Sequence, residues 1–158
     1  MSETWSERRA TEDDVLQVLA IEREWNPAPW SEKGFREELG RTDHDFLVIT
    51  DDETDAVVVA YGVSARVRVD DDAVEILSVA VLKTTRHQGF GSRILQALVR
   101  HAFRQGGERI FLNVRRNNQP AIQLYQKNGF RITHVRKGFY TDGEDAYEMT
   151  LMKAELTP

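Results

Sequence analysis

The sequence predicts an α/β fold, in which a mixed β-sheet carries helices on its faces. Runs rich in β-branched residues alternate along the chain with segments whose apolar residues recur at helical spacing. One long helical segment joins two of the strand-like runs, which implies at least one parallel pair, whereas short turns join other runs as antiparallel neighbours. The predicted order of elements is β-α-α-β-β-β-α-β-α-β-β.

The first third of the chain is expected to supply two helices. Thr11 can cap a helix over about residues 12–24, because acidic residues fill its first turn and apolar residues form a stripe along it. The two prolines of "NPAPW" cannot continue this helix. Ser31 is expected to cap a second, shorter helix that runs through Leu39.

The middle of the chain reads as an antiparallel meander followed by a helix. Three β-rich runs cover residues 46–50, 56–67 and 74–81, and the acidic segments "DDETD" and "DDD" between them are interpreted as solvated turns. From Gly89 to about Arg104 the apolar residues fall at helical spacing, and two glycines then end the helix.

The last third is expected to hold a strand over residues 109–114 and a helix over residues 118–128. Pro120 is tolerated in the first turn of that helix, and Gly129 ends it. Strands over residues 130–135 and 145–152 follow, around the turn "YTDGED". Since the sequence shows no repeat, linker or break in composition, residues 1–158 are expected to form a single domain.

Composition narrows the class of function. The absence of cysteine excludes disulfides, thiolate metal sites and a cysteinyl intermediate. The four histidines lack the spacing of metal ligands, so no metal is expected. A net charge of −5 works against nucleic-acid binding and suits a basic polypeptide partner. No membrane-spanning run or signal peptide is apparent, so a cytoplasmic location without a membrane partner is expected.

The segment "RHQGFGS" at residues 86–92 lies between a strand-like run and a helix. Unpaired backbone N–H groups at such a helix start can bind an anion, and Gly89 and Gly91 allow a close approach. A Walker loop would need a lysine that is missing here, and a dinucleotide fingerprint would need a third glycine. Taken alone, the segment fits an anion site and a simple turn about equally well.

Two motifs in order resemble the acetyl-CoA-binding core of the GNAT N-acetyltransferase superfamily. The first is Arg-x-x-Gly-x-Gly after the strand at residues 74–81, and the second is an asparagine ahead of "AIQLY" and Gly-Phe at residues 118–130. The segment "PWSEKGF" resembles Rim-type ribosomal-protein alanine N-acetyltransferases, and "RKGFYTDGEDAYEM" resembles archaeal Ard-type N-terminal acetyltransferases. The resemblance covers residues 8–152 and implies a GNAT fold with acetyl-CoA as co-substrate.

The resemblance also implies roles for individual residues. The strand backbone would hold the thioester and its pantetheine arm, and the loop would hold the pyrophosphate. Asn118 would contact the cofactor, and its alternative role is a helix cap, which could coexist with that contact. Tyr125 would act as general acid for the departing thiolate, with packing beside Phe130 as its alternative role. The implied cofactor-binding set is Val79, Ala80, Val81, Arg86, His87, Gln88, Gly89, Phe90, Gly91, Ser92, Asn118 and Tyr125.

The general base is where this sequence departs from the Rim and Ard types. Their Leu-Glu-Val motif reads Leu-Asn113-Val here, and an amide cannot act as a base, although it can orient a water or the amine. Glu75 matches the place where histone-acetylating members of the superfamily keep a catalytic glutamate. Strand alternation can direct Glu75 into the same cleft, and an exposed strand carboxylate is the equally weighted alternative.

The resemblance implies that Trp30, Phe139 and Tyr140 line the groove for the acceptor. The expected function is acetylation of an alanine-like N-terminal α-amine, for example of a ribosomal protein, by direct attack of the amine in a ternary complex. One alternative is acetylation of a lysine or a small amine. Another is a GNAT-fold module that binds CoA without catalysis, and oligomeric state is left open.

Overall fold

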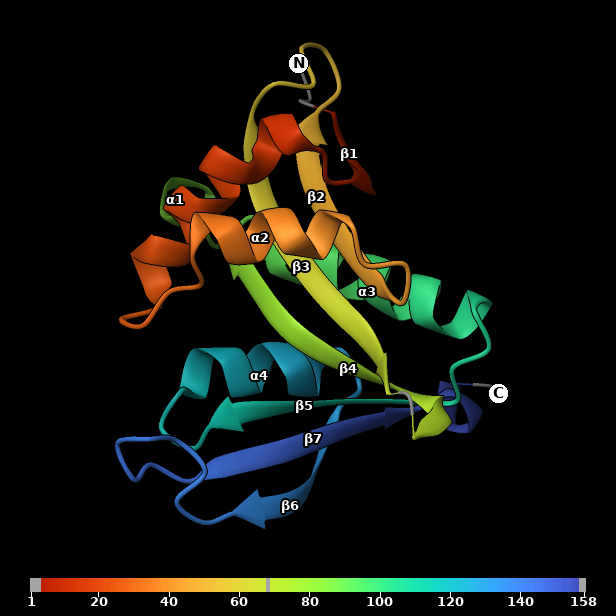
Figure 1. Ribbon diagram of the computed structural model, residues 1–158. Helices are drawn as coiled ribbons and strands as arrows, with labels where there is room; N and C mark the ends of the chain where they lie inside the picture. The colour runs from red at the N-terminus through yellow and green to blue at the C-terminus, as the bar shows by residue number, and fades with distance from the viewer. Residues whose placement is uncertain (1–3, 68, 157–158) are drawn as a thin grey trace. The chain divides into compact units, whose positions relative to one another are not determined.

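The computed structural model describes residues 4–67 and 69–156. Within these ranges the chain has the predicted α/β fold, with a mixed sheet in the strand order β1-β2-β3-β4-β5-β7-β6 (Figure 1). The strands are β1 (Trp5–Arg9), β2 (His44–Asp51), β3 (Val58–Val67), β4 (Asp70–Val81), β5 (Arg109–Arg115), β6 (Arg131–Arg136) and β7 (Ala146–Met152). The helices are α1 (Val15–Trp25), α2 (Glu32–Leu39), α3 (Phe90–Arg104) and α4 (Gln119–Lys127). This is the predicted order of elements, including the first strand, for which the sequence suggested no range.

The chain divides into two compact units. The first holds the residues up to Ala65 together with Leu77–His101, and the second holds Arg66–Ile76 and the residues from Ala102 onward. Strand β4 contributes its start to the second unit and its end to the first.

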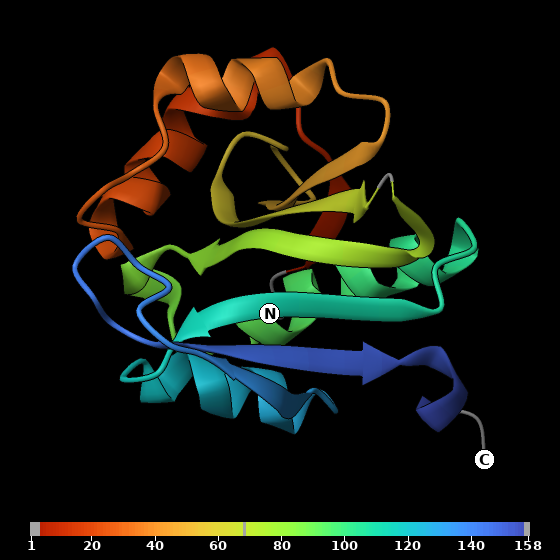
Figure 2. The same ribbon diagram turned by 60° about the horizontal axis from the view of Figure 1, so that its bottom comes forward.

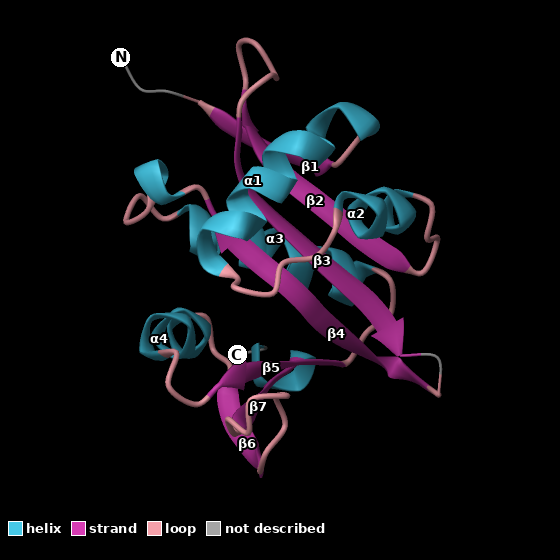
Figure 3. Cartoon of the chain, turned by 60° about the vertical axis from the view of Figure 1, so that its left-hand side comes forward, coloured by secondary structure: helices cyan, strands magenta, loops and turns pink. Residues whose placement is uncertain are grey.

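In the first unit, α1 and α2 lie on one side of β2 and β3, and α3 lies on the other side (Figures 1 and 3). The core between α1, α2 and these strands is aromatic as well as aliphatic. The ring of Phe35 lies 5.5 Å from that of Tyr61 and 5.8 Å from that of Phe46. All three side chains are buried, so α2 is fixed to the sheet by ring packing.

Both predicted helix starts are confirmed. The Ser31 hydroxyl accepts a hydrogen bond from the Gly34 N–H at 2.9 Å, which caps α2. Thr11 precedes a 3₁₀ turn over Glu12–Asp14 that leads into α1, and its N–H donates to the Asp14 carboxylate at 2.7 Å. The predicted helix over residues 12–24 therefore begins as a tighter turn.

One of the two acidic segments is a turn, and the other is not. In "DDETD" the Asp51 carboxylate accepts hydrogen bonds from the N–H groups of Glu53 and Thr54, as a solvated turn requires. The prediction for "DDD" is wrong, because Asp70 already begins β4. The carbonyl of Asp72 accepts a hydrogen bond from the Glu108 N–H at 2.8 Å, so backbone pairing extends the strand beyond its apolar run.

Gly62 on β3 lets α3 pack closely on the sheet. A Cβ atom at this position would lie 2.6 Å from Cδ1 of Leu98 and 3.2 Å from Cγ1 of Ile94, both fully buried on α3. We therefore expect Gly62→Val to lower the free energy of unfolding by about 1–3 kcal/mol through overpacking. Urea unfolding measures this change. Gly40→Ala is the control, since its Cβ would meet only ordinary contacts, and an equal loss in both variants would contradict the packing argument.

The second unit is a four-stranded part of the sheet that includes the start of β4. Ala73–Glu75 of β4 pair in parallel with Arg109–Phe111 of β5, which confirms the predicted parallel pair. Strands β5 and β7 run antiparallel side by side from Arg109↔Met152 to Arg115↔Ala146 (Figure 2). Strand β6 pairs with β7 and has an irregularity between Ile132 and His134. Its six residues are all exposed.

Candidate active site

The loop before α3 has the geometry of an anion site. His87 and Gly89 both have positive φ values, 67° and 85°, which turn the chain sharply into the helix. The Gly89 carbonyl accepts the first helical hydrogen bond, from the Arg93 N–H at 3.1 Å. Residues 86–89 are exposed, and Phe90 is buried against Trp5 with ring centroids 5.1 Å apart. Phe90 thus anchors the start of α3, the positive end of the helix dipole, next to the exposed residues 86–89.

The end of β4, which precedes this loop, is held in place by α1. The indole N–H of Trp25 donates to the Val81 carbonyl at 2.6 Å, and the Lys83 N–H donates to Glu24 at 3.0 Å. Val79, Ala80 and Val81 are all only partly buried. The predicted thioester-holding strand and the predicted phosphate loop therefore follow one another in the first unit.

Trp30 lies on the loop between α1 and α2 in the same unit. Its ring packs 5.3 Å from that of Phe35, and the backbone N–H of Trp30 donates to the buried Glu22 carboxylate at 2.9 Å. The same carboxylate accepts hydrogen bonds from the Tyr61 hydroxyl at 2.8 Å and from Asn26 at 3.1 Å. A satisfied buried carboxylate therefore fixes the loop that presents Trp30.

Helix α4 in the second unit presents Asn118 and Tyr125. The Asn118 side chain accepts a hydrogen bond from the Ala121 N–H at 3.3 Å and caps the helix. Tyr125 packs 6.0 Å from Phe130, as its alternative role suggested. Burial, with a smaller contribution from Tyr140, raises the pKa of Tyr125 to about 12. Its phenol is therefore protonated at neutral pH, the state that a general acid needs.

Glu75 and Asn113 lie on neighbouring strands of the second unit. Glu75 on β4 pairs with Phe111, two residues before Asn113 on β5, so the alternation of strand residues puts both side chains on one face. Burial raises the pKa of Glu75, the Glu148 charge raises it further, and the Arg136 charge partly opposes both. The Glu75 carboxylate is only partly exposed, which argues against the alternative of a solvated surface glutamate.

Phe139 and Tyr140 lie in the loop between β6 and β7. Their rings make an edge contact at 5.0 Å, and the Phe139 side chain is 49% exposed. The Arg115 guanidinium lies 4.1 Å from the centre of the Tyr140 ring and pairs with Asp142 at 2.9 Å. Burial raises the pKa of Tyr140, and the Arg115 charge partly opposes this shift. Arg115 therefore holds the aromatic pair on an otherwise exposed loop.

The structure groups the predicted residues by unit. The first unit holds Trp30, Val79, Ala80, Val81, Arg86, His87, Gln88, Gly89, Phe90, Gly91 and Ser92. The second unit holds Glu75, Asn113, Asn118, Tyr125, Phe139 and Tyr140. Sequence reasoning assigned no role to the ionic partners Arg115, Arg136 and Glu148, although the segment "RKGFYTDGEDAYEM" contains the last two. Their roles appear from the contacts of Arg115 with Tyr140 and of Arg136 with Asn113, and from the strand register.

Within residues 4–67 and 69–156, no group of three or more His, Asp or Glu side chains is arranged to hold a metal ion. In the same ranges no helix is both long enough and apolar enough to cross a membrane.

Comparison with known proteins gives the family. Residues 15–130 match the Acetyltransferase (GNAT) family. The chain is 34% identical over 154 residues to an N-alpha-acetyltransferase of Sulfurisphaera tokodaii, covering 90% of this chain and 89% of that protein. It is 31% identical over 141 residues to the [ribosomal protein bS18]-alanine N-acetyltransferase of Escherichia coli, covering 87% of this chain and 90% of that protein.

Solved structures of acetyltransferases have the same fold as this chain. The crystal structure of the Escherichia coli ribosomal-protein-S18-alanine N-acetyltransferase superposes with a TM-score of 0.80 at 27% identity and 94% coverage of both chains. Ard1 from Thermoplasma volcanium superposes with a TM-score of 0.84 at 25% identity, covering 94% of this chain and 97% of that one. The chain therefore belongs to the GNAT acetyltransferase family, whose members use acetyl-CoA, and it is an N-acetyltransferase.

Proposed function

We propose that the protein transfers the acetyl group of acetyl-CoA to the N-terminal α-amine of a polypeptide. An alanine-like first residue is the preferred acceptor, and a ribosomal protein is the kind of partner we expect. The observation that carries the proposal is the similarity to N-alpha-acetyltransferases over nine-tenths of the chain. We further propose that residues 1–158 act as one catalytic domain.

In the first unit, the residues proposed to bind the co-substrate act through their backbone. The backbone N–H groups of residues 87–92 and the α3 dipole are proposed to bind the pyrophosphate, next to the exposed residues 87–89, and Arg86 adds a positive charge. The backbone of the partly buried residues Val79–Val81 is proposed to orient the thioester, with an N–H that polarises its carbonyl. Acetyl-CoA supplies the acyl group in activated form.

In the second unit, the proposed residues move protons. Glu75 takes a proton from the acceptor ammonium, directly or through a water, and the free amine then attacks the thioester carbonyl. Tyr125 gives its phenolic proton to the departing thiolate and regains one from solvent. The carbon–sulfur bond breaks as the carbon–nitrogen bond forms, the attacking nitrogen releases its second proton to solvent, and no covalent acyl-enzyme is needed. Asn118 is proposed to contact the co-substrate as well as cap α4.

The proposed acceptor-binding residues are aromatic. Tyr140 and Phe139 are held as a pair by Arg115, and Trp30 is held by Glu22 and Phe35. Such side chains suit the backbone and small first side chain of a polypeptide. The substitution of Asn for a carboxylate at position 113 favours the second candidate function, which is transfer to a lysine side chain or a small amine.

An acceptor panel distinguishes these two functions. We expect thiol release from acetyl-CoA with a peptide that begins with alanine, and we expect mass spectrometry to locate the acetyl group on the α-amine. The matched control is the same peptide with a blocked N-terminus and an internal lysine, and a polyamine serves as the small-amine acceptor. Faster turnover of the blocked lysine peptide or of the polyamine would replace the proposal with the second candidate.

A further inference from the structure

A buried carboxylate lies across the sheet from the position where the base motif is interrupted. Glu148 of β7 is the register partner of Asn113 of β5, and its side chain faces the same side of the sheet. Glu148 is only 6% exposed. A buried carboxylate needs partners, and its partners here are all on β6.

Arg136 of β6 connects Glu148 to Asn113. Its guanidinium forms an ion pair with one Glu148 oxygen and donates to Asn113 Oδ1 at 3.2 Å. Because arginine can only donate, the Asn113 carbonyl must point at Arg136, and the Asn113 NH₂ group points away from it. Asn113 can therefore donate a hydrogen bond to a water, whose other lone pair remains available for an amine proton.

The second oxygen of Glu148 is also occupied. His134 Nδ1 lies 2.9 Å from it, and the Thr133 hydroxyl lies 3.4 Å from it. Burial by itself would raise the pKa of Glu148, but the hydrogen bond and charge of Arg136, followed by those of His134, hold this pKa below its ordinary value. Glu148 is therefore a fixed negative charge at neutral pH and a poor candidate for the base itself.

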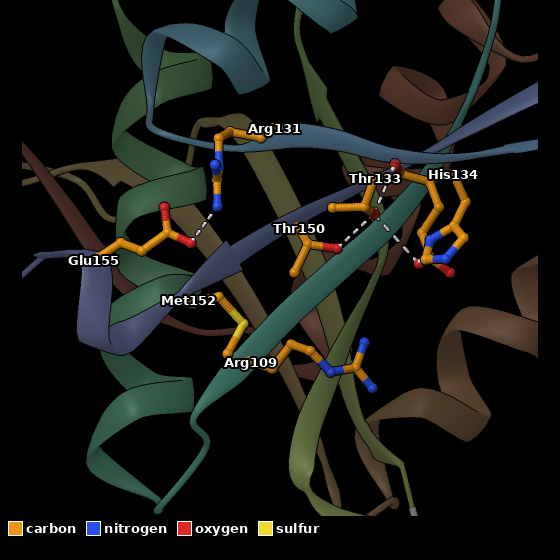
Figure 4. Close-up of a pocket in the computed structure, with 8 residues that line it drawn as sticks. Arg109, Arg131, Thr133, His134, Thr150, Met152 and Glu155 are labelled. Carbon is orange, nitrogen blue, oxygen red and sulfur yellow. Dashed lines mark hydrogen bonds and ion pairs between the residues drawn. The ribbon is translucent and has the colours of Figure 1, made fainter.

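Glu75 shares the face of this ion pair. Glu75 is the register partner of Phe111, which in turn pairs with Thr150 of β7. The Asn113–Glu148 pair lies two residues after Phe111 along β5. On this face, Arg109, Arg131, His134, Glu148 and Glu155 line a cavity of about 350 Å³ (Figure 4). Arg131 is paired with Glu155 at 2.7 Å, and Arg136 and Glu148 form the ion pair that lies beside Asn113.

We propose that Arg136 and Glu148 are positioning residues that set the protonation of Glu75 and fix the orientation of the Asn113 amide. This inference rests on the proposed role of Glu75 as base. The negative charge of Glu148 makes Glu75 a stronger base, and the positive charge of Arg136 limits that effect while holding Asn113. Position 113 has no carboxylate, and these two charged residues act beside it by orienting Asn113 and adjusting the pKa of Glu75. Neither of them takes the proton.

The test is the pKa of Glu75 in the full-length protein, measured from its side-chain ¹³C carboxyl resonance, which Glu75→Gln assigns. We expect Glu148→Gln to lower this pKa and Arg136→Gln to raise it, each by about half a pH unit. In the double variant Arg136→Gln/Glu148→Gln, which leaves no unpaired buried charge, the pKa should return toward the parent value. Glu148→Asp and Arg136→Lys keep the charges and should shift the pKa less than the neutral variants.

Glu155→Gln is the matched control, because it removes a carboxylate from the same cavity and should leave the pKa of Glu75 unchanged. On the acidic side of the pH profile, kcat/KM should shift with the measured pKa of Glu75 in both variants. A pKa shift of about half a unit changes kcat/KM there about threefold. Absent or same-direction pKa shifts in the two neutral variants would overturn the inference. Opposite pKa shifts without any response of the rate would support the inference and contradict the role of Glu75 as base.

Discussion

Glu75→Gln is expected to lower kcat by about tenfold at pH 7 and by about 50- to 100-fold at pH 6. The substitution keeps the shape of the side chain and removes its ability to take a proton. Because burial and Glu148 raise the pKa of Glu75 in the parent, its carboxylate is a stronger base than a solvated glutamate. An amide at the same position leaves the acceptor dependent on the small fraction that is already a free amine.

The pH dependence makes this expectation specific. The α-amine of a polypeptide has a pKa of about 7.7–8, so most of the acceptor is deprotonated near pH 9 and needs no base. The deficit of Glu75→Gln should therefore be largest at pH 6–7 and shrink as the pH rises toward 9. Rates with a saturating peptide across this range measure it, with acetyl-CoA affinity expected to stay close to the parent value.

A matched variant separates the chemistry from a general loss of charge. Asp72→Asn removes an exposed carboxylate from the same strand and should leave kcat and its pH dependence unchanged. A uniform deficit at every pH in Glu75→Gln would point to a damaged fold, and parent-like rates near neutral pH would remove Glu75 from the mechanism.

The local features of this structure could be predicted from the sequence. The caps at Ser31 and Asn118 and the end of α4 at Gly129 depend on side-chain chemistry within a few residues, and each was predicted at its place. The extension of β4 to Asp70 could not be predicted, because it depends on a backbone hydrogen bond to Glu108, far along the chain. Propensity alone assigns three consecutive aspartates to a turn.

The same limit applies to the candidate site. Motifs indicated the phosphate loop and Tyr125, whose neighbours in sequence belong to the pattern. Glu148 and Arg136 lie in the segment "RKGFYTDGEDAYEM", but their relation to Asn113 appears only once β5, β7 and β6 are in register. A register shift of one residue would place Glu148 on the opposite face of the sheet, so its role follows from the ladder and not from its local sequence.

Tyr125→Phe is expected to lower kcat by about 10²–10³-fold while the affinity for acetyl-CoA is mostly kept, since only a hydroxyl is removed. A thiol leaving group has a pKa of about 8.5, so it departs more easily with a proton than as a free thiolate. A pKa of about 12 keeps the Tyr125 phenol protonated at neutral pH, which is the form that the proposed acid requires. Steady-state rates and equilibrium binding of acetyl-CoA measure the two effects separately.

The leaving group offers a sharper test of the same residue. If Tyr125 protonates the thiolate, the deficit of Tyr125→Phe must shrink with an acetyl thioester whose thiol is more acidic, because that thiolate needs less help to depart. If Tyr125 only packs beside Phe130, the phenylalanine variant keeps this contact, and its rate should match the parent with both donors. Tyr147→Phe removes a hydroxyl from β7 and is the control, for which neither donor should reveal a deficit.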